Sequence, residues 1–266
     1  MNPVFKNLLS RLGPPLIAFV LIVGAWQGIV AIAKLPTYLL PKPSDIVAAA
    51  ADNWTHLLGS VSTTLIETIA GFLLSVVGGV LGAILLASSK IVERSIYPYA
   101  IVLQTIPIVA VAPIIVIWFG AGIRSIVTIA FLIGFCPMLS NTLIGLNSTD
   151  KNLNNLFTLY NATKWQTMWR LRIPAALPYI VGGLKISCSL CVIGAIVGEY
   201  VAGVGGGQGG LGYAITYAAM RIQTPYLFAC GLMASILGIA FYQIVNGLSR
   251  KWLGSWHESE MRGDND

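Results

Sequence analysis

The sequence predicts an all-α membrane protein with six transmembrane helices. Three observations support this: 56% of the 266 residues are hydrophobic, only 10% are charged, and long apolar stretches recur along the chain. Soluble domains carry about 25% charged residues, and a bilayer is crossed by a helix of about 20 apolar residues. This chain has too little charge to cover a water-exposed surface. We therefore expect one polytopic transmembrane domain over residues 1–266.

Six stretches are long enough to cross the bilayer. Four contain no charged residue, and two carry embedded charges, which are Glu67 in one and Lys185 with Glu199 in the other. In chain order the six are Leu12–Ala33, Ser60–Ser89, Ser95–Ile123, Ser125–Thr149, Pro174–Gly203 and Ile222–Ser249.

The first stretch follows Lys6 and Arg11, as the apolar part of a signal peptide would. It has the length of a full span, and no clear small-x-small cleavage pattern ends it. We expect a retained first helix rather than a cleaved signal.

Residues 34–60 are predicted to form a segment on the outer side. Prolines recur within residues 34–43, where they cannot continue a helix. Ser44 is a candidate N-cap for an interfacial helix over Ile46–Leu58, with Trp54 at headgroup level.

The second span carries small residues at every fourth position, namely Gly71, Ser75, Gly79 and Ala83. This spacing predicts a face for close helix packing. In the third span, Pro107 is one of several prolines that free backbone carbonyls. They indicate either a polar pathway or helix shaping alone.

Basic residues are distributed unevenly about these spans. With alternating helices and a cytoplasmic N-terminus, eleven of the sixteen lie on the cytoplasmic side, four on the outer side and one inside a span. This positive-inside bias places both termini in the cytoplasm. The net charge of +6 therefore reflects topology and contact with lipid headgroups, and predicts no nucleic-acid partner.

Residues 203–221 are predicted to form an outer glycine-rich loop. Gly205, Gly207 and Gly210 satisfy G-x-G-x-x-G, but no strand precedes them, so nucleotide binding is not expected. Cys188 and Cys191 lie on an apolar helix without a second pair, which favours packing over a metal or redox site. We find no catalytic set, no metal site and no cofactor site, and expect a protein that is not an enzyme.

Polar groups inside the spans are candidates for the pathway, because such residues face the bundle interior or water. They are Glu67, Asn141 and Glu199, joined by Pro107. Lys185 lies early in its span and can snorkel to the headgroups. An ion-coupled secondary transporter using Glu67 and Glu199 is the alternative that these carboxylates suggest.

A polar segment at 150–173 interrupts the apolar pattern. Its first half places Leu153, Leu156 and Phe157 on one helical stripe, and its second half begins near Trp165. Between them, Asn161 can end a helix in the left-handed conformation and Thr163 can cap the next. We expect two short helices joined by a tight turn on the cytoplasmic side, with a shape suited to a partner groove.

Several motifs resemble those of a known family. Ile173-Pro174-Ala175-Ala176-Leu177-Pro178-Tyr179-Ile180 follows this segment, and Leu40–Asp45, Trp118-Phe119-Gly120, Val197–Tyr200 and Gly210–Tyr213 occur in a matching order. The chain resembles transmembrane permease subunits of bacterial ABC importers, in the nitrate, taurine, alkanesulfonate and pyrimidine-precursor group. The resemblance covers about residues 12–255. Asn155 and its neighbours replace the family's E-A-A, and Asn161 replaces its glycine.

The resemblance implies a MetI-like type I importer fold in the bacterial inner membrane. It implies a second permease copy, two cytosolic ATPase subunits that bind ATP and Mg, and a periplasmic or lipid-anchored solute-binding protein. The cargo would be a small organic or oxyanion solute, such as nitrate, a sulfonate or a pyrimidine precursor. Candidates for docking the binding protein are Trp54, Gln208 and Arg221. Residues implied for ATPase coupling are Asp150, Leu153, Asn155, Leu156, Phe157, Asn161, Ala162, Thr163 and Trp165.

Overall fold

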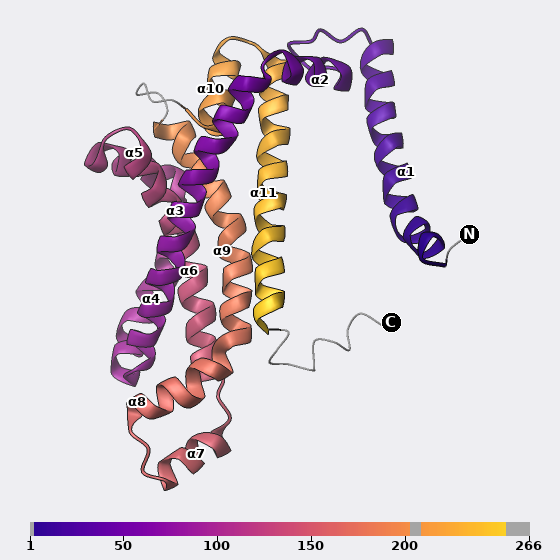
Figure 1. Cartoon of the computed structure of the whole chain (residues 1–266). Coiled ribbons are helices and arrows are strands. Elements are labelled where there is room, and N and C mark those ends of the chain that lie inside the picture. Colours follow the sequence, from indigo (N-terminus) through magenta and orange to yellow (C-terminus); the bar gives the residue numbers. More distant parts are fainter. Residues whose placement is uncertain (1–2, 203–208, 254–266) are drawn as a thin grey trace.

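The computed structural model describes residues 3–202 and 209–253, and all of its regular elements are helices. In chain order they are α1 Pro3–Ile32, α2 Pro43–Asp52, α3 Trp54–Ala87, α4 Lys90–Thr105, α5 Ile108–Phe119, α6 Ile123–Asn147, α7 Lys151–Leu159, α8 Lys164–Thr167, the π-helix η1 Met168–Arg172, α9 Ile173–Ala202, α10 Leu211–Met220 and α11 Thr224–Leu253. Long helices run between two ends, one carrying α2 and α10 and the other carrying α7 and α8 (Figure 1).

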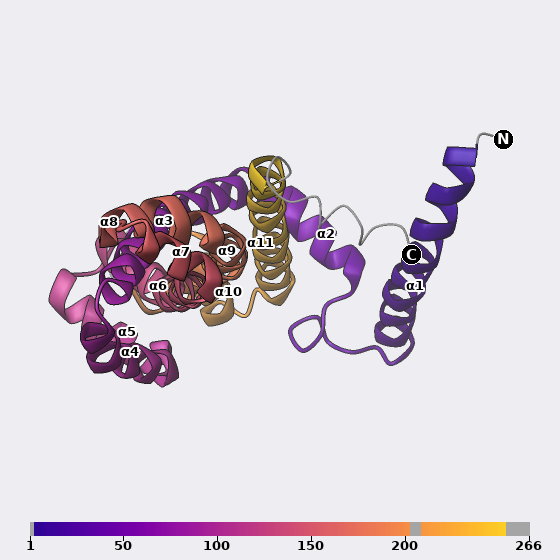
Figure 2. The same ribbon diagram turned by 90° about the horizontal axis from the view of Figure 1, so that it is seen from below.

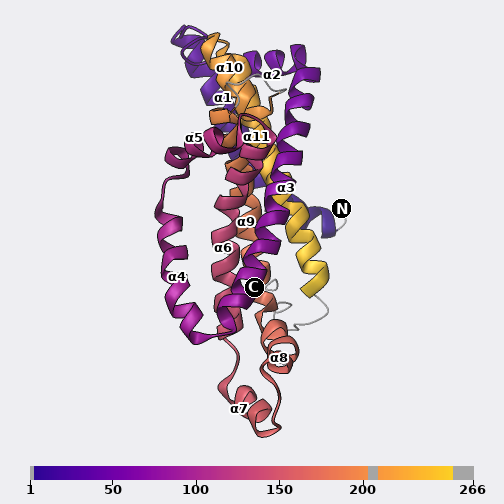
Figure 3. The same ribbon diagram turned by 90° about the vertical axis from the view of Figure 1, so that its left-hand side faces the viewer.

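Within these residues, five helices are long and apolar enough to cross a membrane, and α4 with α5 would be a sixth if the bent pair counts as one span. The prediction of six candidate spans is thus confirmed by length and composition. The third is not one straight helix, because α4 and α5 meet at 101°. Ile106 is extended and Pro107 is the N-cap of α5, as expected where a proline restricts the preceding residue. Figure 3 shows α4 alongside the bundle and α5 turned across it.

Helices α3, α6 and α9 form the centre of the bundle. The predicted small-residue face is confirmed, because Gly71, Ser75, Gly79 and Ala83 are all buried. A Cβ added at Gly79 would lie 2.7 Å from Cβ of Met138 on α6, so the two backbones approach too closely for a larger residue.

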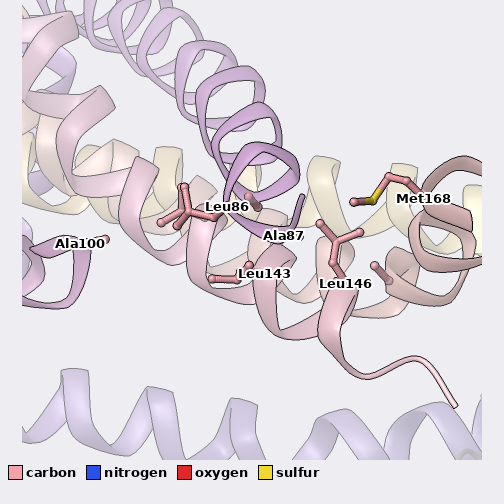
Figure 4. Packing of buried hydrophobic residues seen from close by; sticks show 9 residues of the cluster. Leu86, Ala87, Ala100, Leu143, Leu146 and Met168 are labelled. Atoms are coloured by element: carbon pink, nitrogen blue, oxygen red, sulfur yellow. The ribbon is translucent and has the colours of Figure 1, made fainter. Parts of the chain in front are cut away.

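An apolar cluster closes the bundle at the end that carries α7 and α8. Figure 4 shows Leu86 and Ala87 of α3 beside Leu143 and Leu146 of α6, with Met168 of η1 across from them. Cys188 and Cys191, in contrast, are buried in a second cluster between α9, α3 and α11, which agrees with the packing interpretation.

The first helix stands apart from the bundle (Figure 2). Only 6% of the residues in its apolar 18-residue stretch are buried against the rest of the protein. Near its end, Gln27 Nε2 donates to Ser44 Oγ at 3.1 Å, and the Trp26 ring lies 6.0 Å from that of Phe228 on α11. The exposed face of α1 is apolar, as lipid contact requires.

Two helix boundaries within residues 34–60 differ from the sequence prediction. Lys42, not Ser44, is the N-cap of α2, because Pro43 takes the first helical position, which suits its fixed φ and missing N–H. The outer helix ends at Asp52 rather than Leu58. Trp54 is therefore the first residue of the long helix α3 instead of part of an interfacial helix.

The helix that crosses the membrane as α9 begins earlier than predicted. Helix α8, η1 and α9 follow one another without a break from Lys164 to Ala202. Pro174 lacks the N–H that an α-helical bond would need, and the backbone N–H of Ile173 bonds to the carbonyl of Met168. The proline is accommodated by a π-turn rather than by a break between two helices.

Candidate coupling surface and outer cavities

The predicted turn between the two short helices is present. Asp150 is the N-cap of α7 and accepts a bond from the Asn152 N–H at 2.7 Å. Asn161 has φ of 53°, and the N–H groups of Asn161 and Ala162 bond back to the carbonyls of Thr158 and Phe157. These two bonds and the left-handed residue form a Schellman C-cap. The expectation that Asn161 ends a helix is confirmed.

Thr163 starts the second helix as predicted. Its hydroxyl accepts from the Gln166 N–H at 3.2 Å, and Gln166 Oε1 accepts from the Thr163 N–H at 2.8 Å. This reciprocal pair is a capping box. Both ends of the turn are fixed by local hydrogen bonds, so the hairpin of α7 and α8 holds its shape without a partner.

The hairpin presents apolar side chains to its surroundings. Leu153 and Leu156 are about half exposed, Tyr160 is 80% exposed and Trp165 is 67% exposed. The Trp165 ring packs edge-on against that of Trp169 at 5.4 Å. Asn155 is also exposed, whereas Phe157 and Ala162 are partly buried. We name the exposed set Leu153, Leu156, Leu159, Tyr160, Trp165 and Trp169 the hairpin face.

Arg172, at the base of the hairpin, is not among the residues predicted for coupling. Its guanidinium donates to the carbonyl of Leu146 at 2.8 Å, to that of Ala87 at 2.9 Å and to Asn147 Oδ1 at 2.8 Å. Ala87 is the last residue of α3, and Leu146 and Asn147 end α6. A cation at helix C-termini satisfies free carbonyls and opposes the helix dipole. Arg172 therefore ties η1 to two core helices.

The connection extends to α4 through Asn147. Its Nδ2 donates to Glu93 Oε1 at 2.7 Å, and Lys90 lies 3.4 Å from Glu93 Oε2. A cavity of about 860 Å³ separates the hairpin from the ends of α3 and α6, with Ala162 and Arg172 among its lining residues. Among the described residues, Arg172 thus supplies directional hydrogen bonds from the base of the hairpin to the bundle.

At the opposite end, Glu199 of α9 is fully engaged by hydrogen bonds. Its Oε1 accepts from the Thr64 hydroxyl at 2.6 Å, and its Oε2 accepts from the Gly212 N–H at 2.6 Å. The same Thr64 oxygen accepts from the Leu211 N–H at 2.8 Å. Glu199 and Thr64 together hold the start of α10 against α3 and α9.

Glu67, predicted separately as a pathway residue, lies beside Glu199. The two carboxyl groups interact directly, and both line a cavity of about 310 Å³. Glu67 is only 3% exposed, and its Oε2 has no hydrogen-bond partner among the described residues. The sequence did not predict that Glu67 and Glu199 lie together, because nothing in a single sequence indicates which residues of two different spans are in contact.

A wider cavity of about 720 Å³ opens next to this one, and the two share Thr63, Gly209 and Tyr213. Arg221, predicted to contact a docking protein, lines the wider cavity with its guanidinium 4.3 Å from the Tyr217 ring centre. Trp54 is half exposed nearby in the chain and does not line it.

The remaining predicted residues lie elsewhere. Pro107 sits at the bend between α4 and α5. Asn141 donates to the carbonyl of Pro137 at 2.9 Å within its own helix and packs near Gly183, so it belongs to the α6–α9 interface. Gln208 lies outside the described residues.

Comparisons with known proteins agree with this architecture. Residues 75–254 match the family described as "Binding-protein-dependent transport system inner membrane component". The formylaminopyrimidine transport permease protein ThiX of Halalkalibacterium halodurans is 36% identical, over 88% of this chain and 92% of its own. The riboflavin transport system permease protein RibX of Chloroflexus aurantiacus is 32% identical, over 93% and 91%. The nitrate import permease protein NrtB of Synechococcus elongatus is 27% identical, over 96% and 90%.

A solved structure, described as an amino acid ABC transporter with histidines, matches with a TM-score of 0.60. It covers 77% of this chain and 97% of its own, at 17% identity. At that identity the likeness supports the predicted MetI-like helical fold.

Proposed function

This chain belongs to the binding-protein-dependent transport system inner membrane component family and is a multi-pass inner-membrane permease, and on that premise we propose that it is the membrane subunit of an ATP-driven importer. Two copies form the translocation pathway. Each receives a cytosolic ATPase subunit on its hairpin face, and a periplasmic or lipid-anchored binding protein delivers cargo at the α2–α10 end.

The observation that carries the proposal is the hairpin face. Aromatic and aliphatic side chains stand exposed on a turn that is fixed by its own caps. Such a preformed, apolar and aromatic helical surface suits insertion into a groove on a partner, because little order must be gained on binding. In the topology predicted from basic residues, this surface faces the cytoplasm, where an ATPase would be.

This subunit would catalyse no reaction itself. ATP and Mg would be bound and turned over by the partner ATPases, and the permease would contribute the pathway and the mechanical connection. The cargo would be a small organic or oxyanion solute, as the range of relatives suggests.

One observation favours a second candidate function. Glu67 and Glu199 lie side by side in a buried cavity, and paired carboxyl groups inside membrane helices occur in proton relays. An ion-coupled carrier would use this pair without an ATPase.

Reconstitution into lipid vesicles separates the two functions. The permease is inserted with its ATPase and binding protein, and separately alone with an imposed proton gradient. We expect uptake only in the first case, and only with hydrolysable ATP. Uptake by the permease alone, driven by the gradient, would refute the importer and establish the carrier.

A further inference from the structure

Two buried carboxyl groups are in direct contact near the α2–α10 end. Glu67 of α3 is 3% exposed and Glu199 of α9 is 1% exposed, and both line the smaller cavity. Among the described residues that line it there is no lysine, arginine or histidine, and Tyr213 is the one other titratable side chain. His56 and Arg221 line the adjoining wider cavity and not this one. Two carboxylates in contact repel each other strongly where water is excluded and no cation balances them. One of the two groups therefore carries a proton.

The hydrogen bonds at Glu199 identify it as the ionised member of the pair. Its Oε1 accepts from the Thr64 hydroxyl at 2.6 Å, and its Oε2 accepts from the Gly212 N–H at 2.6 Å. Bonds to a charged carboxylate are short, about 2.5–2.7 Å from a hydroxyl and about 2.7–2.9 Å from a charged N–H donor. The Thr64 hydroxyl lies farther from the Ser60 carbonyl, at 3.1 Å, so the carboxylate is its closer acceptor. Both oxygens of Glu199 thus meet donors, as a carboxylate requires.

Glu67 has the opposite surroundings. Its Oε2 is buried, and no donor among the described residues reaches it. A protonated carboxyl group has one O–H donor, whereas an ionised one only accepts hydrogen bonds. A proton on Glu67 therefore turns its contact with Glu199 from a repulsion into a hydrogen bond to a charged acceptor, which is one of the stronger kinds. Glu199 then accepts from three donors.

The position of Glu199 also sets the position of α10. The Gly212 N–H, which donates to Glu199, lies in the first turn of this helix. A Cβ added at Gly210 would overlap Oε1 of Glu199, and one added at Gly212 would lie 2.9 Å from its Cβ. The backbone that begins α10 is thus packed directly against the Glu199 side chain, and a shift of that side chain would move the helix.

We propose that Glu67 is a positioning residue that carries a proton and donates a hydrogen bond through it to the Glu199 carboxylate, thereby holding the start of α10 against α3 and α9. Tyr213 and Tyr217 of α10 line the wider cavity, as does Arg221 directly after the helix. The shape of this end of the protein then depends on one buried proton. The proposal goes beyond the importer function and rests on it only for the effect of this end on transport.

The first test detects the proton in the wild-type chain, and so does not depend on how a variant folds. Infrared spectra of the purified full chain, at neutral pH in dodecyl maltoside micelles that contain no carbonyl group, should show the stretch of a protonated carboxyl group. The band should disappear in Glu67→Gln. It should persist in Glu199→Gln, where Glu67 still lies in a cavity whose described lining holds no cation. It should also persist in the control Glu93→Gln, because Glu93 lies beside Lys90. Absence of the band from the wild-type chain, its survival in Glu67→Gln or its loss in Glu199→Gln would overturn the proposal.

The second test measures how firmly α10 is held. Hydrogen exchange followed by mass spectrometry reports the protection of the Leu211 and Gly212 amides, which bond to Thr64 and Glu199. Glu67→Gln keeps a donor of similar shape and should keep the protection close to that of the wild-type chain. Glu67→Met is of similar size but has no donor, and should lower the protection about tenfold or more, as loss of a bond to a charged acceptor predicts.

Ile66→Met is the matched control for this exchange measurement. Ile66 precedes Glu67 on the same helix and is 59% exposed, so its replacement should leave the protection of α10 unchanged. Wild-type protection in Glu67→Met, or an equal loss in Glu67→Gln and Glu67→Met, would show that no proton donated by Glu67 holds the helix.

These outcomes are separable from those for the importer. Absence of the infrared band removes this inference and leaves ATP-driven uptake untouched. Uptake without an ATPase removes the importer and leaves the proton on Glu67 standing. The importer should keep its uptake in Glu67→Gln, whereas a carrier that passes a proton through Glu67 would lose it.

Discussion

Replacement of Arg172 by alanine would remove three hydrogen bonds at the base of the hairpin, to Leu146, Ala87 and Asn147. A bond from a charged donor contributes about 1.5–3 kcal/mol where the acceptor stays buried. Arg172 is only partly buried, and water can reach helix ends at the membrane surface. About 0.5–1.5 kcal/mol per bond is therefore a better figure. The packing of the hairpin base against α3 and α6 would lose about 2–4 kcal/mol of stabilisation. This corresponds to a factor of roughly 30 to 900 in the equilibrium constant for that packing.

The assay compares uptake with ATP hydrolysis in vesicles that contain the complete transporter. In Arg172→Ala the hairpin face itself is unchanged, so the ATPase should still bind and hydrolyse ATP. Movement of the hairpin would no longer be passed to α3 and α6, and solute imported per ATP should fall about tenfold or more. Arg172→Lys keeps the charge but lacks the planar fork of donors, and should give an intermediate ratio.

Arg170 provides the matched control. It lies two positions earlier, is exposed, and makes no hydrogen bond to the part of the chain that the structure describes. Arg170→Ala should keep the wild-type ratio. The same ratio in Arg172→Ala and Arg170→Ala would show that these three bonds do not transmit the movement.

Three further changes test the hairpin and the core. Ala162→Glu should abolish uptake while membrane fractions retain the protein on immunoblots, because a bulky charge enters the space behind the tight turn; unchanged uptake would contradict the coupling role. Asn161→Val should destabilise the turn by about 1–2 kcal/mol and speed amide exchange in α7, whereas Asn161→Gly should not; equal exchange in both would count against the left-handed cap. Gly79→Ala should lower the free energy of unfolding by about 1–3 kcal/mol in thermal unfolding, because the added methyl group overpacks against Met138. Gly59→Ala is the control, because a methyl group there meets no atom within 4 Å. Equal melting temperatures for the two variants would argue against close contact between α3 and α6.

Local sequence rules predicted much of the fold. The apolar stretches gave the spans, and the four-residue repeat from Gly71 to Ala83 gave the packed face of α3. The turn was also predictable, because Asn161 and Thr163 act on their immediate neighbours. These features depend on hydropathy, spacing and residue conformation, all of which can be judged within a few turns of the chain.

The rest depends on contacts between distant segments. Arg172 bonds to residues 26 and 85 positions away, and only the folded bundle brings those carbonyls within reach. Glu67 and Glu199 come together for the same reason, through the packing of α3 on α9. The 101° bend was partly foreseeable from Pro107, but its angle is set by tertiary packing.

The length of α9 has a geometric consequence. Ile173 begins this helix and Glu199 lies near its other end, about 39 Å away along the axis at 1.5 Å per residue. The chain turns through η1 into α8, which lies at an angle to α9 (Figure 1). A tilt of α9 by about 10° about one end would displace its other end by about 7 Å. Under the proposed function, such a tilt would widen or narrow the outer end of the permease without a series of side-chain rearrangements along the helix. ATP hydrolysis at the cytoplasmic end and solute access at the outer end would then both depend on the tilt of α9.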